Sequence, residues 1–307
     1  MIRAGSRLER VLHSGAFAVT AEVVPPRSAD PHAVTEQARG LVGYADAVNV
    51  TDNPASSVHM TPVAGAAMVA AAGLEPVMQV TCRDRNRLGL TSDLLGGWAL
   101  GARNVLCLTG DPTSVGDHPD ARGVYDLDVL QLIGLAARLR DEGRSLAGGE
   151  LRPAPRYFIG VAEVPLAEPY DPTRLERKAD AGADFVQTQI VYDVDAFGEW
   201  ADSVRPRGIF ERVFVLAGVA PPHGAGSARS MRERLPGVVV PDAVIDALEA
   251  AGPDGESAQG VRLTVEIVRR LREVEGIAGV HVMGLGREDP VRRVVDEAGL
   301  LPRPAAI

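Results

Sequence analysis

The sequence predicts an α/β fold, a single (β/α)8 TIM-type barrel that forms one domain over residues 1–307 and carries extra helices near the C-terminus. Eight short β-branched runs alternate with longer segments whose apolar residues recur at helical spacing, which is the pattern of a barrel. A chain of 307 residues has the length of one barrel-sized domain. A doubly wound sheet is the alternative architecture, but no GxGxxG pattern follows the first strand.

The expected strands are short and apolar, and they cover residues 18–24, 47–51, 76–81, 104–108, 157–161, 185–190, 213–217 and 279–283. Amphipathic segments between them predict helices at 31–42, 60–72, 85–97, 126–140, 172–181 and 195–204. Further helical segments at 227–235, 241–251 and 258–275 place extra helices between strands seven and eight. Residues 143–156 join a helix to the next strand, so we expect a structural loop at the bottom of the barrel.

Composition narrows the class of protein. A net charge of −9 argues against nucleic acid or an anionic membrane as a partner, and no apolar stretch has the length to span a bilayer. The first residues are charged and lack the apolar core of a signal peptide, so we expect a cytoplasmic protein. The six histidines show neither HxH nor HExxH spacing, so no metal site is expected. Cys82 and Cys107 lie in apolar runs and are expected to be buried free thiols.

Glu22 is the first candidate for chemistry. It lies in the apolar run 17–24, and Pro25 and Pro26 end the strand just beyond it. Burial would disfavour the charged carboxylate and raise its pKa, and a protonated carboxyl at the carboxyl end of a strand is suited to donate a proton. An edge-strand glutamate that points into water is the other interpretation.

Polar residues recur at the ends of the other strands, where barrel enzymes place their working groups. The candidates at these ends are Thr51, Gln79, Thr109, Gly110, Asp111, Ala162 and Gln189. Taken singly, the threonines could be ordinary strand residues, Gln189 a core amide and Asp111 a turn cap. A charged helix face formed by Asp171, Arg174, Arg177 and Lys178 could grip phosphate and ribose, or could simply be solvated.

These motifs together resemble the methylenetetrahydrofolate reductase family, nearly from end to end. The opening signature matches residues 21–26 (AEVVPP), the second strand 48–51 (VNVT) and the fourth 108–111 (LTGD). The later signature matches 177–183 (RKADAGA) with Thr188 and Gln189, and the last strand matches 279–283 (GVHVM). The runs 81–86 (TCRDRN), 106–112 (LCLTGDP) and 115–117 (VGD) are most similar to the acetogen-type reductase and to the reductase half of bifunctional homocysteine methyltransferase fusions.

The resemblance implies a flavoprotein that reduces 5,10-methylenetetrahydrofolate to 5-methyltetrahydrofolate. Hydride would come from NADH or NADPH through FAD, with FMN possible. Glu22 would be the general acid that protonates N10 of the folate, and Asp111 would bind the pterin and favour the cationic iminium. Gln189 would contact the folate. By the family pattern the flavin ring is lined by Thr51, Gln79, Thr109, Gly110, Asp111, Tyr125, Asp126 and Ala162, and its ribityl, phosphate or adenosine portions are held by Asp171, Arg174, Arg177 and Lys178.

Departures from the family pattern leave the flavin type and the electron donor open. Many members have His where Gln79 stands and Arg where Thr109 stands. One alternative is a pterin- or corrinoid-linked methyl-transfer protein that binds a methylated folate without flavin. Another is a reductase subunit that depends on a zinc-binding partner protein, as in some acetogen-type relatives. The family also implies a homo-oligomer.

Overall fold

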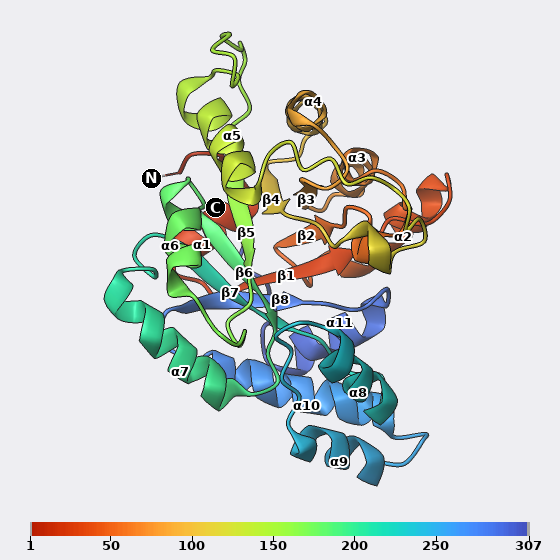
Figure 1. Cartoon of the computed structure of the whole chain (residues 1–307). Helices are drawn as coiled ribbons and strands as arrows, with labels where there is room; N and C mark the ends of the chain where they lie inside the picture. Colours follow the sequence, from red (N-terminus) through yellow and green to blue (C-terminus); the bar gives the residue numbers. More distant parts are fainter. Residues whose placement is uncertain (1, 306–307) are drawn as a thin grey trace.

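The computed structural model describes residues 2–305, and its strands form a closed parallel barrel in which β8 pairs with β1 (Figure 1). The strands of this part of the chain are β1 (Ala18–Val23), β2 (Ala47–Val50), β3 (Pro76–Thr81), β4 (Asn104–Leu108), β5 (Phe158–Glu163), β6 (Phe185–Ile190), β7 (Phe214–Val219) and β8 (Ile277–Val282). Every predicted strand overlaps an observed one. The predicted TIM-type barrel is confirmed.

Helices follow the strands around the outside of the barrel (Figure 1). They are α1 (Arg7–His13), α2 (Pro31–Leu41), α3 (Pro62–Ala71), α4 (Arg87–Ala99), α5 (Val129–Glu142), α6 (Pro172–Asp180), α7 (Val194–Val204), α8 (Ala225–Arg234), α9 (Asp242–Ala250), α10 (Glu256–Leu271) and α11 (Glu288–Glu297), with 3-10 turns η1 (Pro54–Ser56), η2 (Thr113–Val115) and η3 (Arg205–Arg207). Because α8, α9 and α10 all lie between β7 and β8, the prediction of extra helices there is confirmed.

Helices α1 and α11 were not predicted. Helix α1 begins at Ser6, whose hydroxyl accepts a hydrogen bond from the backbone N–H of Glu9 at 3.0 Å. The Glu9 carboxylate in turn accepts from the backbone N–H groups of residues 3, 4 and 5. The apolar side of α1, with Leu8 and Leu12, packs against the lower interior of the barrel. This helix therefore closes the bottom of the barrel, away from the carboxyl ends of the strands.

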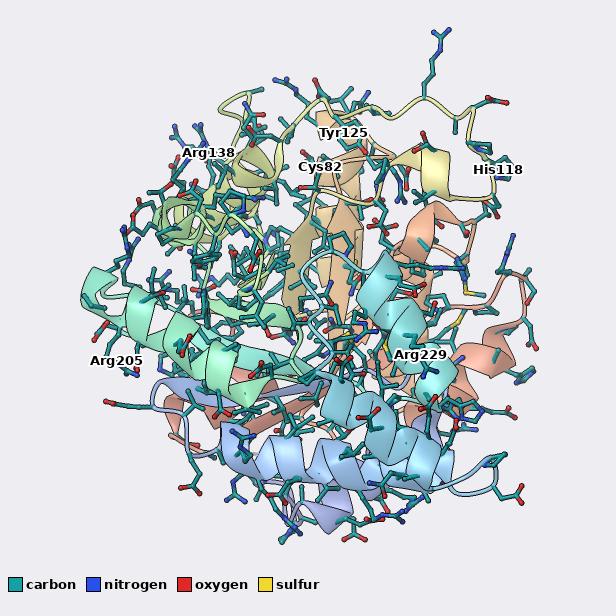
Figure 2. The ribbon with its side chains drawn as sticks, turned by 60° about the horizontal axis from the view of Figure 1, so that its bottom comes forward. Cys82, His118, Tyr125, Arg138, Arg205 and Arg229 are labelled. Atoms are coloured by element: carbon teal, nitrogen blue, oxygen red, sulfur yellow. The ribbon has the colours of Figure 1, made fainter. Side chains whose placement is uncertain are left out.

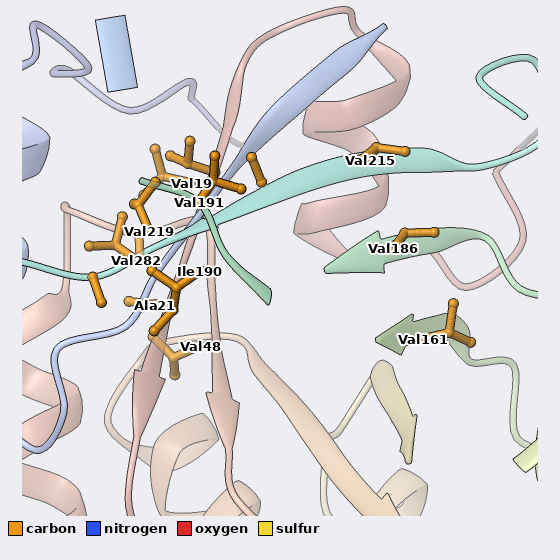
Figure 3. Close-up of a cluster of buried hydrophobic side chains, with 14 of the residues drawn as sticks. Val19, Ala21, Val48, Val161, Val186, Ile190, Val191, Val215, Val219 and Val282 are labelled. Atoms are coloured by element: carbon orange, nitrogen blue, oxygen red, sulfur yellow. The ribbon is translucent and has the colours of Figure 1, made fainter. Parts of the chain in front are cut away.

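Successive residues of each strand face opposite sides of the barrel wall. Val19 and Ala21 of β1 and Val48 of β2 project outward into the main apolar cluster between the barrel and its helices (Figure 3). Ala18 and Phe185 project inward and fill the bottom of the barrel. Inward-facing residues one layer higher are polar.

That polar layer joins four buried side chains from four strands. The Asn49 amide donates to Gln187 Oε1 at 2.7 Å, and the Gln187 amide donates to Thr20 Oγ1 and to Asn49 Oδ1, each at 3.1 Å. Thr20 Oγ1 lies 3.0 Å from Nδ1 of His281. Burial lowers the pKa of His281 from 6.5 to about 4, so its ring is neutral near pH 7. The layer is a rigid, uncharged floor beneath the upper end of the barrel.

The remaining predictions on the chain's organisation concern single segments. Residues 143–156 join α5 to β5 at the bottom of the barrel, as predicted, and a bridge between Arg144 and Glu150 closes the loop. Cys82 and Cys107 are buried and free. Within residues 2–305, no helix combines the length and apolar character needed to cross a membrane.

Candidate active site

A cavity of about 430 Å³ lies at the carboxyl ends of β1 to β5 and extends to the start of α6. Its volume falls within the range of small-molecule and cofactor sites, and its position is the functional end of a barrel. Most of the predicted site residues line it, namely Glu22, Thr51, Gln79, Thr109, Gly110, Asp111, Ala162, Asp171, Arg174 and Lys178. Tyr125, Asp126, Arg177 and Gln189 do not belong to its lining.

Glu22 projects inward from β1, above Thr20 on the same face of the strand. Burial raises the pKa of its carboxyl from 4.5 to about 7. The side chain keeps partial access to the cavity, and no residue between 2 and 305 forms a hydrogen bond or ion pair with its carboxyl. The group is therefore half protonated near neutral pH and free to exchange a proton with a bound ligand.

Thr51 gives a second polar group without a protein partner. Its hydroxyl is buried in the cavity wall, and within the described residues it has no hydrogen-bond partner. Buried hydroxyls are normally satisfied, so this one is suited to a ligand or an ordered water.

Near its start, the β4–α5 loop carries Gly110 and Asp111 at the edge of the cavity. Gly110 has a left-handed backbone (φ +89°). The Asp111 carbonyl accepts a hydrogen bond at 3.1 Å from Nη1 of Arg83, a buried residue of the β3–α4 loop. Arg83 lines the cavity as well, although the sequence pattern gave it no role.

Asp52, which follows β2, is a buried acid of a different kind. Its Oδ2 accepts from the backbone N–H of Thr81 at 2.8 Å and from the Thr81 hydroxyl at 2.9 Å, and it pairs with the Arg85 guanidinium. Burial raises the pKa of Asp52, and Arg85 counteracts that effect. Through Oδ2, Asp52 braces the ends of β2 and β3, and its side chain also lines the cavity.

Helix α6 borders the cavity on the β5 side. Asp171 caps its first turn, and the hydrogen bonds that it accepts from the Thr173 hydroxyl at 2.6 Å and from the Thr173 backbone N–H at 3.0 Å lower the pKa of Asp171. Lys178 Nζ donates to the Ala162 carbonyl at 2.6 Å and to Glu163 Oε2 at 2.8 Å. Lys178 is thus engaged at the end of β5, while Arg174 forms no ion pair within residues 2–305 and remains available to an anionic ligand.

Tyr125 and Asp126 lie farther along the β4–α5 loop. The Tyr125 N–H donates to the Cys82 carbonyl, and its side chain is 44% exposed (Figure 2). Asp126 accepts three hydrogen bonds from Arg87, at 2.8 to 3.0 Å, which lower the pKa of Asp126 to about 2. Figure 2 also labels His118, which lies in the middle of the same loop.

Gln189 does not line the cavity, and it lies within an irregularity of β6. Gln187 pairs with Leu216 and Ile190 with Gly218, so β6 carries one extra residue between these pairs. The bulge breaks the alternation of side chains, and Gln189 Nε2 donates to the Pro236 carbonyl at 3.4 Å. A side chain at Gly218 would collide with the Thr188 carbonyl, so the bulge requires glycine in the neighbouring strand.

The cavity fits the flavin that the sequence resemblance implies. It offers the unpartnered Thr51 hydroxyl on its wall, a glycine that admits close approach at Gly110, and the Arg174 cation at its α6 edge. These are groups for a flat polar ring and a phosphorylated chain. In the part of the chain from 2 to 305, no three His, Cys, Asp or Glu side chains gather as a metal site would require.

Comparison with known proteins identifies relatives of this chain. Methylenetetrahydrofolate reductase 1 of Schizosaccharomyces pombe is 30% identical over 240 residues, which are 74% of this chain and 36% of that protein. The 5,10-methylenetetrahydrofolate reductase of Salmonella typhimurium is 25% identical over 238 residues, 75% of this chain and 72% of that protein. The chain spans less than half the length of the eukaryotic relatives it matches, between 36% and 44%.

A solved structure of similar fold is an uncharacterized protein from Clostridium thermocellum that binds two copies of 5-methyl-5,6,7,8-tetrahydrofolic acid. It superposes with a TM-score of 0.65 at 12% identity, covering 96% of this chain and 99% of that one. The family model described as methylenetetrahydrofolate reductase matches residues 7–299. The chain belongs to the methylenetetrahydrofolate reductase family.

Proposed function

We propose that the protein reduces 5,10-methylenetetrahydrofolate to 5-methyltetrahydrofolate, with NADH or NADPH as the hydride donor and residues 1–307 acting as one catalytic domain. Family membership supports the reaction class. The observation that carries the proposal is the Glu22 carboxyl, which lies unpaired in the cavity with a pKa raised to about 7.

The chemistry explains why such a carboxyl is needed. The five-membered ring of the substrate must open to a cationic iminium before hydride arrives, and N10 must gain a proton for this to happen. Glu22 holds a proton near neutral pH and supplies it, directly or through a water molecule. Asp111 binds the pterin, and its negative charge favours the iminium cation.

A bound flavin, FAD or FMN, would accept hydride from the nicotinamide and pass it to the folate. Thr51, Gln79, Thr109, Gly110 and Ala162 hold its ring in this proposal, and Arg174 binds its phosphorylated chain. The proposed cofactor residues are completed by Asp111, Tyr125, Asp126, Asp171, Arg177 and Lys178. Of these, Asp126 at present bonds Arg87, and Lys178 bonds Glu163.

Folate binding extends the proposal to Gln189. The folate-binding protein of similar fold carries a product-type ligand, 5-methyltetrahydrofolate, which is consistent with a pterin site on this architecture. Gln189 would reach the folate after releasing the Pro236 carbonyl, a bond that is long at 3.4 Å. We place the chain with the acetogen-type reductases and the reductase halves of bifunctional fusions, so a zinc-binding partner protein and a homo-oligomer belong to the proposal.

The visible absorption spectrum of the purified chain tests the proposal. We expect flavin bands that bleach when NADH or NADPH is added without oxygen and return when methylenetetrahydrofolate follows. Flavin that neither nicotinamide reduces contradicts the proposed donor and directs the assay to a partner protein. A colourless protein that takes up no FAD or FMN contradicts the flavin mechanism and favours flavin-independent reduction or methyl transfer.

A further inference from the structure

Arg83 is the most completely buried cation next to the cavity, with 1% of its surface exposed. It lies two residues beyond β3, at the start of the β3–α4 loop. A buried guanidinium is costly unless its donors are satisfied. Nε and Nη2 donate to the two carboxylate oxygens of Asp84 at 2.7 and 2.8 Å. Nη1 also donates to the Asp111 carbonyl at 3.1 Å, and Nη2 to the Asn53 carbonyl at 3.2 Å.

The acceptors come from three separate βα loops. Asn53 follows β2, Asp84 follows β3 and Asp111 follows β4. The planar guanidinium, with its five donors in a fixed geometry, can bridge all three at once, whereas a lysine ammonium is a single point charge. Arg83 therefore sets the spacing of three loops that form one wall of the cavity.

The backbone around the guanidinium is held in uncommon conformations. Asn53 has φ +47°, and its amide donates to Asp84 Oδ2 at 3.2 Å. Gly110 has φ +89°, and a Cβ there would lie 3.0 Å from Cβ of Arg83 and 3.1 Å from Cβ of Thr81. Left-handed residues persist only where the surroundings determine them, and they cluster at functional sites. Arg83 thus holds the backbone just after β4, where the chain turns into the loop that carries Asp111.

The same segment also anchors the far end of the β4–α5 loop. The Arg83 carbonyl accepts from the Val124 N–H at 2.7 Å, and the preceding carbonyl, of Cys82, accepts from the Tyr125 N–H at 3.1 Å. Both ends of the loop that carries Asp111 are therefore tied to residues 82 and 83.

We propose that Arg83 is a positioning residue for the folate, which acts by holding Asp111 in the orientation that binds the pterin ring. The inference rests on the proposed function, because it takes the role of Asp111 from there. Arg83 touches neither substrate nor cofactor in this scheme; its charge is paired with Asp84, and its effect on the ligand passes through the Asp111 backbone.

A double-mutant cycle tests the inference with Arg83→Lys, Asp111→Asn and the combined variant. The measurement is the dissociation constant of 5-methyltetrahydrofolate on the flavin-loaded protein. Because small misplacements near a site cost one to two orders of magnitude, we expect Arg83→Lys alone to weaken binding about tenfold or more. In the Asp111→Asn background the same change should cost less than about twofold, since residues acting as one unit are not additive.

Arg103→Lys is the matched control. Arg103 is another partly buried arginine that bonds carbonyl groups, those of Trp98 and Ala102, but it lies before β4 at the bottom of the barrel. We expect its replacement to leave the dissociation constant unchanged. If Arg83 were merely structural, Arg83→Lys would lower the unfolding temperature, as we expect of Arg103→Lys, and would leave ligand binding intact.

Two outcomes overturn the inference in different ways. If the wild-type protein binds no 5-methyltetrahydrofolate, the proposed function fails and the inference fails with it. If the wild type binds and Arg83→Lys changes affinity by the same factor in both backgrounds, or not at all, the inference alone is wrong. If Arg83→Lys does not fold, Asp84→Asn replaces it, because this change weakens the hold on the guanidinium and keeps Arg83. We expect Asp84→Asn to weaken folate binding less than Arg83→Lys would. This loss should also disappear in the Asp111→Asn background.

Discussion

The ammonium group of Lys178 lies 2.8 Å from a carboxylate oxygen of Glu163, and both side chains are about nine-tenths buried. Lys178 Nζ also donates to the Ala162 carbonyl at 2.6 Å, at the end of β5. The pair therefore joins α6 to the strand end that borders the cavity. The sequence pattern suggested that the Lys178 ammonium is free to bind phosphate, whereas in the structure its charge is neutralised by Glu163.

We predict that Lys178→Met destabilises the protein by about 3–5 kcal/mol, because it leaves the Glu163 carboxylate buried without a partner. Chemical denaturation with urea measures the change in unfolding free energy. The double variant Glu163→Gln/Lys178→Met should recover most of the loss, since no charge is then stranded. Equal destabilisation in the single and double variants would contradict the pairing.

Glu22→Gln should retain flavin and its reduction by nicotinamide but lose folate reduction by about 10²–10⁴-fold, the contribution of a positioned general acid. Stopped-flow measurement of the two half-reactions separates these steps. Glu36→Gln, on the exposed side of α2, is the matched control and should change neither. In the wild type the folate half-reaction should slow as pH rises above about 7, because Glu22 then loses its proton. A normal folate rate in Glu22→Gln would show that another group supplies the proton.

The same carboxyl predicts how stability depends on pH. Its pKa is 4.5 when unfolded and about 7 when folded, so between these values the folded protein binds one more proton than the unfolded chain. Wild-type stability should therefore fall as pH rises through this window. At pH 8, Glu22→Gln should be more stable than wild type by up to about 3 kcal/mol, a value reduced by the side chain's partial solvent access.

Thermal unfolding of wild type and Glu22→Gln between pH 5 and 8 measures that difference. The gap in unfolding temperature should widen with pH. A gap that stays constant would mean that the Glu22 carboxyl titrates at an ordinary pKa in the folded protein.

Gln187→Leu tests the polar layer beneath the site. The leucine would leave the Asn49 amide and the Thr20 hydroxyl without their amide partner inside the barrel, at a cost of about 1–3 kcal/mol. Urea denaturation measures this cost. Val186→Leu, one position away on the outward face of β6, is the control for simple repacking. If Gln187→Leu lowers the unfolding free energy less than Val186→Leu does, the polar layer is not a stabilising network.

The strands were predictable because their sequences carry the signal themselves. Each buried parallel strand is a short β-branched run, and Glu22 was identifiable because a carboxylate inside such a run is unusual. The two unpredicted helices also had signals: Ser6 and Glu9 form a capping pair for α1, and α11 has apolar residues at 291, 294 and 295.

The side-chain partners were not predictable in the same way. Arg83 bonds residues of three loops, and Lys178 pairs with Glu163. Both sets of contacts depend on distances that exist only in the assembled barrel. Gln189 shows a further cause. One extra residue in β6 breaks the alternation of its side chains at Gln189, and that bulge becomes visible only when β6 is paired with β7.

The hydrogen-bonded contact between Thr20 and His281 joins residues 261 positions apart, because β8 closes the barrel against β1. A growing polypeptide on the ribosome therefore holds β1 as an open edge for on the order of 10–50 s at about 5–20 residues per second. During that interval the strand that carries Glu22 can pair with other chains. A long-lived unpaired edge during synthesis is thus a consequence of placing Glu22 on the first strand and the strand that closes against it last in the chain.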